Sequence, residues 1–170
     1  MNIALIGYRG SGKSSIGRRL AGQLWMDFVD TDAVIVQRAG RTIREIFEQG
    51  GEAAFRDLEA QVVADVMARD NQVIALGGGA ILRQESVQRI KAAAKVIYLL
   101  ADAATLHGRI AADPATAHAR PSLTVAGGSL EEVQALLAVR DPLYRAAADA
   151  TLEVTRLSVE DAAAHLMRMI

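Results

Sequence analysis

One short segment near the N-terminus constrains the fold of this 170-residue chain more than any other feature. Residues 7–14 read GYRGSGKS and match the pattern GxxxxGK[ST]. The segment follows a short apolar run, Asn2–Ile6, that reads as a buried parallel strand, and it precedes a predicted helix over Ser14–Leu24. A strand, a glycine-rich turn and a helix in this order predict the phosphate-binding unit of an α/β protein.

The residue types of this loop indicate its chemistry. Glycines let successive backbone N–H groups turn toward one point, and the following helix N-terminus adds partial positive charge. We expect Lys13 to contact the β- and γ-phosphates of a nucleotide, and Ser14 to bind Mg²⁺ through its hydroxyl. The alternative is a glycine-rich strand–helix turn with an incidental lysine.

Predicted strands and helices alternate along the rest of the chain. Further strands are expected at 28–30, 73–76, 96–100 and 150–154. The expected helices cover 31–38, a short segment capped by Thr42, then 52–69, 86–94 and 103–110, and segments capped by Ser129 and Ser158. This alternation predicts a mostly parallel sheet covered by helices on both faces. We expect a single domain over residues 1–170.

Composition excludes several classes of function. The net charge is −1 without a basic or acidic block, so no nucleic-acid partner is expected. The chain has no cysteine, which excludes disulfides and thiol nucleophiles, and its three histidines do not have metal-ligand spacing. The apolar N-terminal run is too short for a signal peptide or a membrane span. We expect a soluble, cytoplasmic protein.

Two carboxylates, Asp30 and Asp32, follow the second predicted strand. Residues i and i+2 of an extended backbone point to the same side, so both could face one site. Phosphoryl transfer needs one carboxylate near the metal and one near the attacking hydroxyl. We assign Asp30 to Mg²⁺ through water, and Asp32 to the acceptor hydroxyl as a base or an orienting group. The alternative is that Asp30 or Thr31 only caps the next helix.

An acceptor site could be completed by an arginine and a glycine turn. Arg56 and Glu59 have i, i+3 spacing on a predicted helix, which favours a surface ion pair. Alternatively, Glu59 holds Arg56 so that the guanidinium grips a substrate carboxylate. Residues 77–79 are three glycines at the carboxyl end of the third strand, where ligands bind in open α/β sheets, although a plain flexible turn is also possible.

Two later arginines are further candidates. Arg120 lies in a loop over 111–123, where it could swing onto the phosphates or remain a solvated loop residue. We expect Arg140 to close a helix that Pro142 interrupts. It would be a second carboxylate clamp, or it would complement the helix dipole.

Together these motifs resemble the shikimate kinase family along nearly the whole chain. The matching motifs, in the family's order and spacing, are GSGKSS at 10–15, DTD at 30–32, FRxxE at 55–59, GGG at 77–79, RP at 120–121 and RxPLY at 140–144. The resemblance implies a P-loop NTPase fold, a three-layer α/β/α sandwich with a five-stranded parallel sheet in the order 2-3-1-4-5. It also implies, as in nucleoside monophosphate kinases, an acceptor-binding helical region at about 31–62 and a mobile lid at about 111–124. The segment before Arg120 is a few residues longer than is usual in the family.

The resemblance further implies a monomeric enzyme of aromatic amino-acid biosynthesis that transfers the γ-phosphate of ATP to the 3-hydroxyl of shikimate with Mg²⁺. The implied shikimate contacts are Asp32, Phe47, Phe55, Arg56, Gly77, Gly78, Gly79 and Arg140. The implied nucleotide contacts are Gly10, Ser11, Gly12, Lys13, Ser14, Ser15, Arg109, Arg120 and Arg156. Lys13, Asp32 and Arg120 would be catalytic, and Ser14 and Asp30 would serve the metal.

Three alternatives remain open. A related small-metabolite kinase, such as a gluconate kinase, also acts on a carboxylate that carries several hydroxyls, although the joint motifs resemble shikimate kinase better. A nucleoside monophosphate kinase would need base-reading loops that the compact segment 42–69 does not suggest. A catalytically silent nucleotide-binding module is opposed by the presence of Lys13, Asp30 and Asp32 together.

Overall fold

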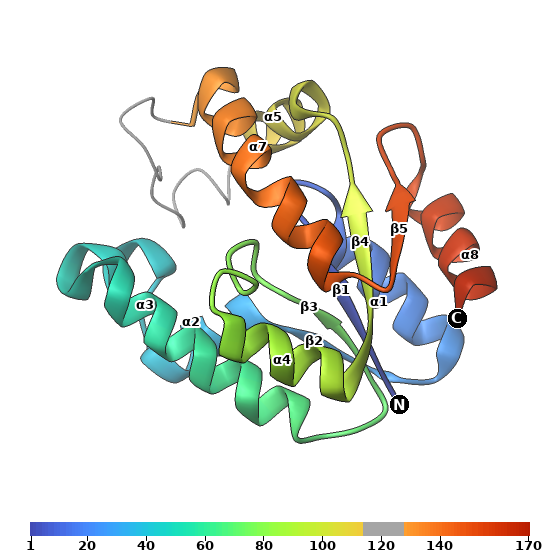
Figure 1. The fold of residues 1–170 in the computed structure, drawn as a ribbon, viewed down its shortest axis with the longest axis horizontal. Coiled ribbons are helices and arrows are strands. Elements are labelled where there is room, and N and C mark those ends of the chain that lie inside the picture. The colour runs from blue at the N-terminus through green and yellow to red at the C-terminus, as the bar shows by residue number, and fades with distance from the viewer. Residues whose placement is uncertain (114–127) are drawn as a thin grey trace.

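Five parallel strands form the central sheet of the computed structural model, which describes residues 1–113 and 128–170 (Figure 1). The strands are β1 (Asn2–Ile6), β2 (Asp27–Asp30), β3 (Gln72–Ala75), β4 (Ala94–Leu100) and β5 (Ala150–Glu153). Their order is β2-β3-β1-β4-β5, and every neighbouring pair is parallel. The predicted fold class and strand order are therefore confirmed.

The middle of the sheet is apolar because helices cover both of its faces. In β1, Ile3, Ala4 and Leu5 are fully buried. Ala4 pairs with Ile74 of β3 on one side and with Val96 of β4 on the other. The phosphate-binding motif therefore follows the central strand directly, and the carboxyl ends of its two neighbours flank it.

The helices lie in two layers around the sheet (Figure 1). They are α1 (Lys13–Leu24), α2 (Thr31–Ala39), α3 (Ile43–Met67), α4 (Gln84–Ala93), α5 (Ala103–Ala112), α7 (Leu130–Ala147) and α8 (Val159–Met169). Helices α1 and α8 pack together on one face of the sheet, whereas α4 and α7 pack against β4 from the other face. Helix α3 contacts both α2 and α4, so it extends this second layer.

Helix α3 consists of two arms joined at Gly51, whose backbone is not helical (φ 77°, ψ 178°). The first arm begins with the predicted capping box. Thr42 Oγ1 accepts a hydrogen bond from the Glu45 amide (3.1 Å), and the Glu45 carboxylate accepts one from the Thr42 amide (2.9 Å). The prediction of a short helix followed by a longer one is thus confirmed, because a glycine conformation separates the arms.

The expectation that Pro142 interrupts its helix, with Arg140 at the helix end, is wrong. Helix α7 continues through Pro142 to Ala147. The missing proline N–H leaves one helical carbonyl without its donor, at a cost of about 3 kcal/mol. Burial of the apolar residues Val133, Tyr144 and Ala147 of α7 offsets this cost. Arg140 therefore stands in mid-helix, where it does not complement the terminal dipole.

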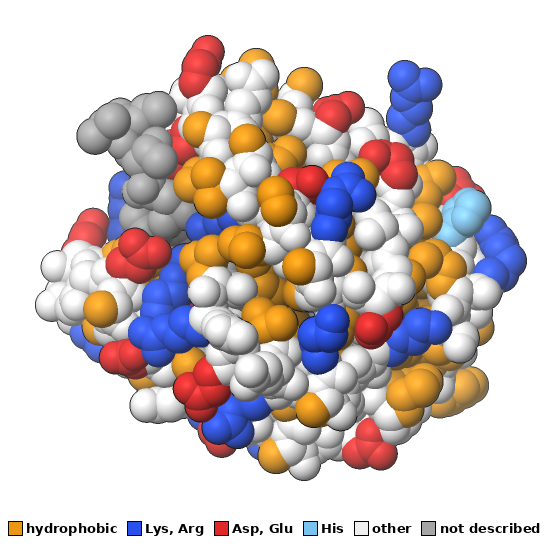
Figure 2. Space-filling model, in the orientation of Figure 1, with side chains coloured by type: hydrophobic (Ala, Val, Ile, Leu, Met, Phe, Trp, Pro, Cys, Tyr) orange, Lys and Arg blue, Asp and Glu red, His pale blue; other side chains and the backbone are white. Residues whose placement is uncertain are grey.

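The surface shown in Figure 2 carries interspersed acidic and basic side chains rather than a block of one sign. Among the described residues, no helix is both long and apolar enough to cross a membrane.

Candidate active site

The phosphate loop has a backbone that glycine makes possible. Gly7, Gly10 and Gly12 all have positive φ angles, of 148°, 87° and 91°. A Cβ atom on Gly7 would lie only 2.6 Å from the Leu99 carbonyl oxygen, so a larger residue cannot stand there. Gly12 is the N-cap of α1, and no side chain of the described residues caps this helix. The first amides of α1 therefore remain available to an anion.

Lys13 lies over the centre of this loop. Its Nζ donates hydrogen bonds to the carbonyl oxygens of Gly7 (2.7 Å) and Tyr8 (3.0 Å). The ammonium charge is thereby held against the backbone of the glycine-rich loop. This arrangement provides positive charge and backbone donors at one place, as phosphate binding requires.

Asp30 accepts hydrogen bonds through both of its carboxylate oxygens. Its Oδ1 accepts hydrogen bonds from the amides of Asp32 (3.0 Å) and Ala33 (3.3 Å), which caps α2. Its Oδ2 accepts one from the hydroxyl of Ser14 (2.6 Å). The helix-capping interpretation is therefore correct, but the second oxygen is left for the loop. A hydroxyl and a carboxylate oxygen side by side are ligands that suit Mg²⁺.

The prediction that residues 30–32 are extended, with Asp30 and Asp32 on the same side, is wrong. Asp30 ends β2, and Asp32 lies in the first turn of α2. Asp32 is 9% exposed and reaches the glycine turn instead of Ser14. A Cβ atom on Gly77 would lie 2.7 Å from Asp32 Oδ1 and 2.9 Å from Glu59 Oε2. Asp30 and Asp32 thus have different neighbours.

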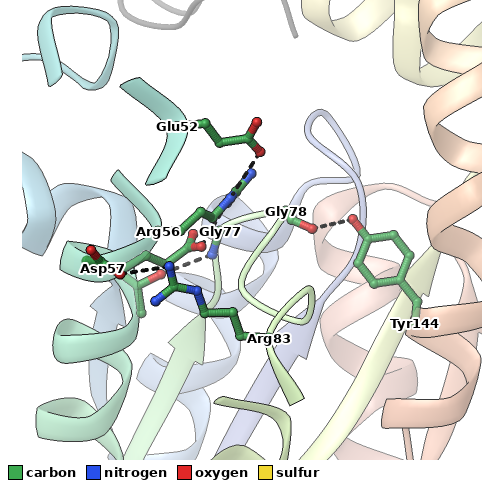
Figure 3. A network of polar contacts seen from close by, with 9 residues as sticks. Glu52, Arg56, Asp57, Gly77, Gly78, Arg83 and Tyr144 are labelled. Atoms are coloured by element: carbon green, nitrogen blue, oxygen red, sulfur yellow. Dashed lines mark hydrogen bonds and ion pairs between the residues drawn. The ribbon is translucent and has the colours of Figure 1, made fainter. Parts of the chain in front are cut away.

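Arg56 forms a buried ion pair, so the surface interpretation of this spacing is wrong. Its Nη1 lies 2.8 Å from Glu59 Oε1, and the two side chains are only 10% and 4% exposed. Arg56 Nε also faces Glu52 at 3.5 Å (Figure 3). Burial raises the pKa of Glu59, whereas the charge of Arg56 opposes this increase. Glu59 Oε2 and Arg56 Nε have no hydrogen-bond partner within the described part of the chain.

The glycine turn at 77–79 is held from two sides (Figure 3). The Gly77 amide donates to Thr31 Oγ1 (3.0 Å), and the Gly78 carbonyl accepts from the Tyr144 hydroxyl (2.6 Å). A Cβ atom on Gly79 would overlap the guanidinium group of Arg56. The sequence did not predict that Thr31 and Tyr144 hold this turn, although they lie within the DTD and RxPLY motifs.

A pair of phenylalanines lies beside Arg56. Phe47 and Phe55 come from the two arms of α3, and their ring centroids are 4.9 Å apart with planes inclined by 35°. Phe55 is buried, whereas Phe47 is partly exposed. The Arg56 guanidinium carbon lies 5.1 Å from the Phe55 ring centroid. The kink at Gly51 therefore lets two residues eight positions apart form one apolar wall.

Arg140 approaches the same turn from α7. Its side chain is buried, with the guanidinium carbon 5.9 Å from the ring centroid of Tyr8 in the phosphate loop. A Cβ atom on Gly78 would lie 3.6 Å from Arg140 Nη1. Two buried arginines, Arg56 and Arg140, thus reach one glycine turn next to the phosphate loop.

Comparison with known proteins identifies the family. A model of the shikimate kinase family matches residues 9–170. The chain belongs to the shikimate kinase family. A shikimate kinase from Symbiobacterium thermophilum is 44% identical over 170 residues, which are 100% of this chain and 96% of that protein.

Solved structures of the family superpose closely on this member. A shikimate kinase from Acinetobacter baumannii in complex with shikimate has a TM-score of 0.92 and 35% identity, covering 99% of this chain and 91% of the other. The shikimate kinase from Aquifex aeolicus has a TM-score of 0.83 and 30% identity, covering 99% and 95%. The P-loop NTPase fold of the family is therefore shared over the whole chain.

The remaining residues that the resemblance implies as nucleotide contacts are Arg109, Arg120 and Arg156. Arg109 donates to the carbonyls of Gly10 (3.3 Å) and Val154 (3.4 Å), whereas Arg156 is exposed. The pKa of Asp102 is lowered mainly by hydrogen bonds from Thr105, and further by the charges of Arg156 and Arg109. Arg109 lies in the last turn of α5, and Arg156 lies between β5 and α8. Arg120 and most of the expected lid, residues 114–124, lie outside the described residues.

Proposed function

We propose that this chain transfers the γ-phosphate of ATP to the 3-hydroxyl of shikimate, which yields 3-phosphoshikimate and ADP in aromatic amino-acid biosynthesis. One observation carries the proposal beyond family membership. Arg56 and Arg140 meet at the glycine turn, directly beside the phosphate loop that holds Lys13. An acceptor with a carboxylate and a hydroxyl fits this combination, because the arginines can bind the carboxylate while the hydroxyl faces the phosphates.

The acceptor side offers the polar groups that such a ligand needs. Arg56 Nε and Glu59 Oε2 are buried without a hydrogen-bond partner in the described residues, which is unusual for interior polar atoms. A carboxylate of the ligand would accept a hydrogen bond from Arg56 Nε, and a hydroxyl of the ligand would donate one to Glu59 Oε2. The wall of Phe47 and Phe55 would pack against a ring. We assign acceptor binding to α2 and α3, within residues 31–62.

Asp32 is the residue we assign to the acceptor hydroxyl. It is nearly buried at Gly77, so its carboxylate can be held in one orientation. Phosphoryl transfer has a loose transition state, in which alignment of the attacking oxygen contributes more than early proton removal. Asp32 would therefore accept the hydroxyl hydrogen bond and take the proton as the new O–P bond forms.

On the nucleotide side, the loop residues Gly10, Ser11, Gly12, Lys13, Ser14 and Ser15 would bind the ATP phosphates. Ser14 and Asp30, whose oxygens are 2.6 Å apart, would hold Mg²⁺. When bound, Mg²⁺ supplies positive charge that neutralises phosphate oxygens during transfer. Arg109 and Arg156 would flank the adenine. The contribution of Arg120, the cytoplasmic location and the monomeric state remain predictions.

Turnover with defined acceptors tests the proposed function. Purified protein with ATP and Mg²⁺ is offered shikimate, quinate or gluconate in separate assays of ADP release. We expect turnover with shikimate, because its ring and carboxylate match the aromatic wall and the two arginines. Turnover on gluconate but not on shikimate would identify a different small-metabolite kinase, and binding of ATP without turnover on any acceptor would indicate a silent module.

Replacement of Gly79 by alanine tests the position of Arg56. The new Cβ overlaps the guanidinium group, so Arg56 must shift away from its acceptor-facing position. We expect the KM for shikimate to rise about tenfold, while the KM for ATP changes by less than about twofold. Gly22→Ala in α1 is the matched control, because its Cβ meets no atom within 4 Å. An unchanged KM for shikimate in Gly79→Ala would show that Arg56 does not contact the acceptor.

A further inference from the structure

Tyr144 connects two parts of the proposed acceptor site. It is fully buried on α7, one turn after Arg140, so both side chains project from the same face of the helix. The Tyr144 hydroxyl donates to the Gly78 carbonyl at 2.6 Å, and the charge of Arg140 opposes the rise in the pKa of Tyr144 that burial causes. A Cβ atom on Gly78 would lie 3.6 Å from Arg140 Nη1, so the tyrosine, the arginine and the glycine turn adjoin one another.

We propose that Tyr144 is a positioning residue that fixes Arg140 and the Gly77–Gly79 turn in one arrangement for binding of the acceptor. The inference rests on the proposed function, because it takes these residues as acceptor contacts. Tyr144 itself acts through these neighbours, since its hydroxyl already donates to the Gly78 carbonyl. The ordinary alternative is a core tyrosine whose hydroxyl is merely satisfied by a nearby carbonyl.

The position of the turn matters because it lies against the phosphate loop. A Cβ atom on Gly78 would lie 3.6 Å from each of three atoms, namely the Gly7 carbonyl oxygen, the Arg9 amide nitrogen and Arg140 Nη1. A movement of the Gly78 peptide would therefore change the position of the acceptor relative to both Arg140 and the phosphates. The Tyr144 hydrogen bond opposes this movement from the side of α7 (Figure 3).

Tyr98, which stacks on Tyr144, supplies a matched control. The rings of Tyr98 and Tyr144 have centroids 4.9 Å apart and planes inclined by 29°. The Tyr98 hydroxyl donates to Asp141 at 2.9 Å, whereas that of Tyr144 reaches the turn. Burial raises the pKa of Tyr144 to about 12, although Arg140 opposes the increase, so its hydroxyl remains a donor at any ordinary assay pH. Replacement by phenylalanine therefore removes either hydroxyl separately while both aromatic rings stay in the core.

Steady-state kinetics of Tyr144→Phe and Tyr98→Phe test the proposal. We expect Tyr144→Phe to raise the KM for shikimate about tenfold, with kcat within about threefold and the KM for ATP within about twofold of the unchanged protein. Tyr98→Phe should leave both KM values unchanged within about twofold, even if both variants lose similar thermal stability. A KM effect without a kcat effect is expected because Arg140 and Gly78 hold the acceptor equally before and during transfer.

Three outcomes would overturn this inference. They are equal shikimate KM values in the two variants, a parallel rise of the KM values for ATP and shikimate, or a fall in kcat alone. If Tyr144→Phe folds poorly, Tyr144→Met is used, since its apolar side chain cannot donate to Gly78, and a shikimate KM above that of Tyr98→Phe is again required. The unchanged protein separates the two proposals: if it does not phosphorylate shikimate, the proposed function fails, whereas normal activity in both tyrosine variants refutes only the positioning role.

Discussion

Replacement of Asp32 by asparagine is expected to lower kcat with shikimate by about 10²–10⁴-fold, because the amide cannot accept the hydroxyl proton. The substitution keeps the size of the side chain, so packing at Gly77 should be preserved. Binding of ATP should change by less than about twofold, since the hydrogen bonds from Lys13 to Gly7 and from Ser14 to Asp30 do not include the Asp32 side chain.

Two measurements separate this role from general damage to the fold. Release of ADP gives kcat, and calorimetric titration with ATP gives the affinity of the nucleotide site. Asp65→Asn is the matched control, because it makes the same chemical change in an exposed ion pair with Arg38 on the surface of α3. A kcat for Asp32→Asn close to that of Asp65→Asn would remove Asp32 from the reaction.

Arg56→Ala is expected to raise the KM for shikimate by about 10²–10³-fold, since a buried, charge-assisted contact to the carboxylate is lost. The same change leaves the carboxylate of Glu59 buried at 4% exposure without its cation, which should cost about 3–5 kcal/mol of unfolding free energy. Shikimate affinity and chemical denaturation are therefore measured together.

A double variant distinguishes the two effects of Arg56→Ala. In Arg56→Ala/Glu59→Gln the buried charge is also removed, so most of the lost stability should return. Shikimate binding should remain weak, because the guanidinium is still absent. Recovery of both stability and shikimate affinity in the double variant would mean that Arg56 only neutralises Glu59.

The pH dependence of stability in Arg56→Ala follows from the raised pKa of Glu59. Burial already raises this pKa, and removal of Arg56 eliminates the main opposing charge. A carboxyl group whose pKa is higher in the folded state than in the unfolded state loses its proton more readily on unfolding. The free energy of unfolding therefore falls as the pH rises through the interval between the two pKa values. Arg56→Ala should lose more stability at about pH 8 than at about pH 5, by urea denaturation at each pH.

The two acidic residues show how far local sequence reasoning reaches. The residue types and their place after β2 identified Asp30 and Asp32 as candidates. The assumed extended backbone was wrong, because Asp30 caps a helix that begins at Thr31. An aspartate that caps a helix and an aspartate in an extended segment occur in similar sequence patterns. Which of the two forms depends on whether the next backbone amides start a helix and need a side-chain acceptor.

The burial of the Arg56–Glu59 ion pair is a second feature that the sequence did not predict. The i, i+3 spacing of Arg56 and Glu59 predicts contact along a helix, and the structure contains that contact. Spacing does not predict burial, since that depends on which elements cover the helix. Here Gly79 of a turn 20 residues beyond Glu59 packs against the guanidinium, so a surface pattern becomes an interior ion pair.

The sequence alone determined the phosphate loop, the strand order through family resemblance, and the types of residue at the active site. These properties depend on local periodicity, on glycine conformations and on motif spacing, all of which the chain carries residue by residue. Only the tertiary structure decided that Pro142 lies inside α7 and that Tyr144 and Thr31 hold the glycine turn. Those contacts join residues 46 and 66 positions apart, and packing across the sheet, rather than local preference, brings them together.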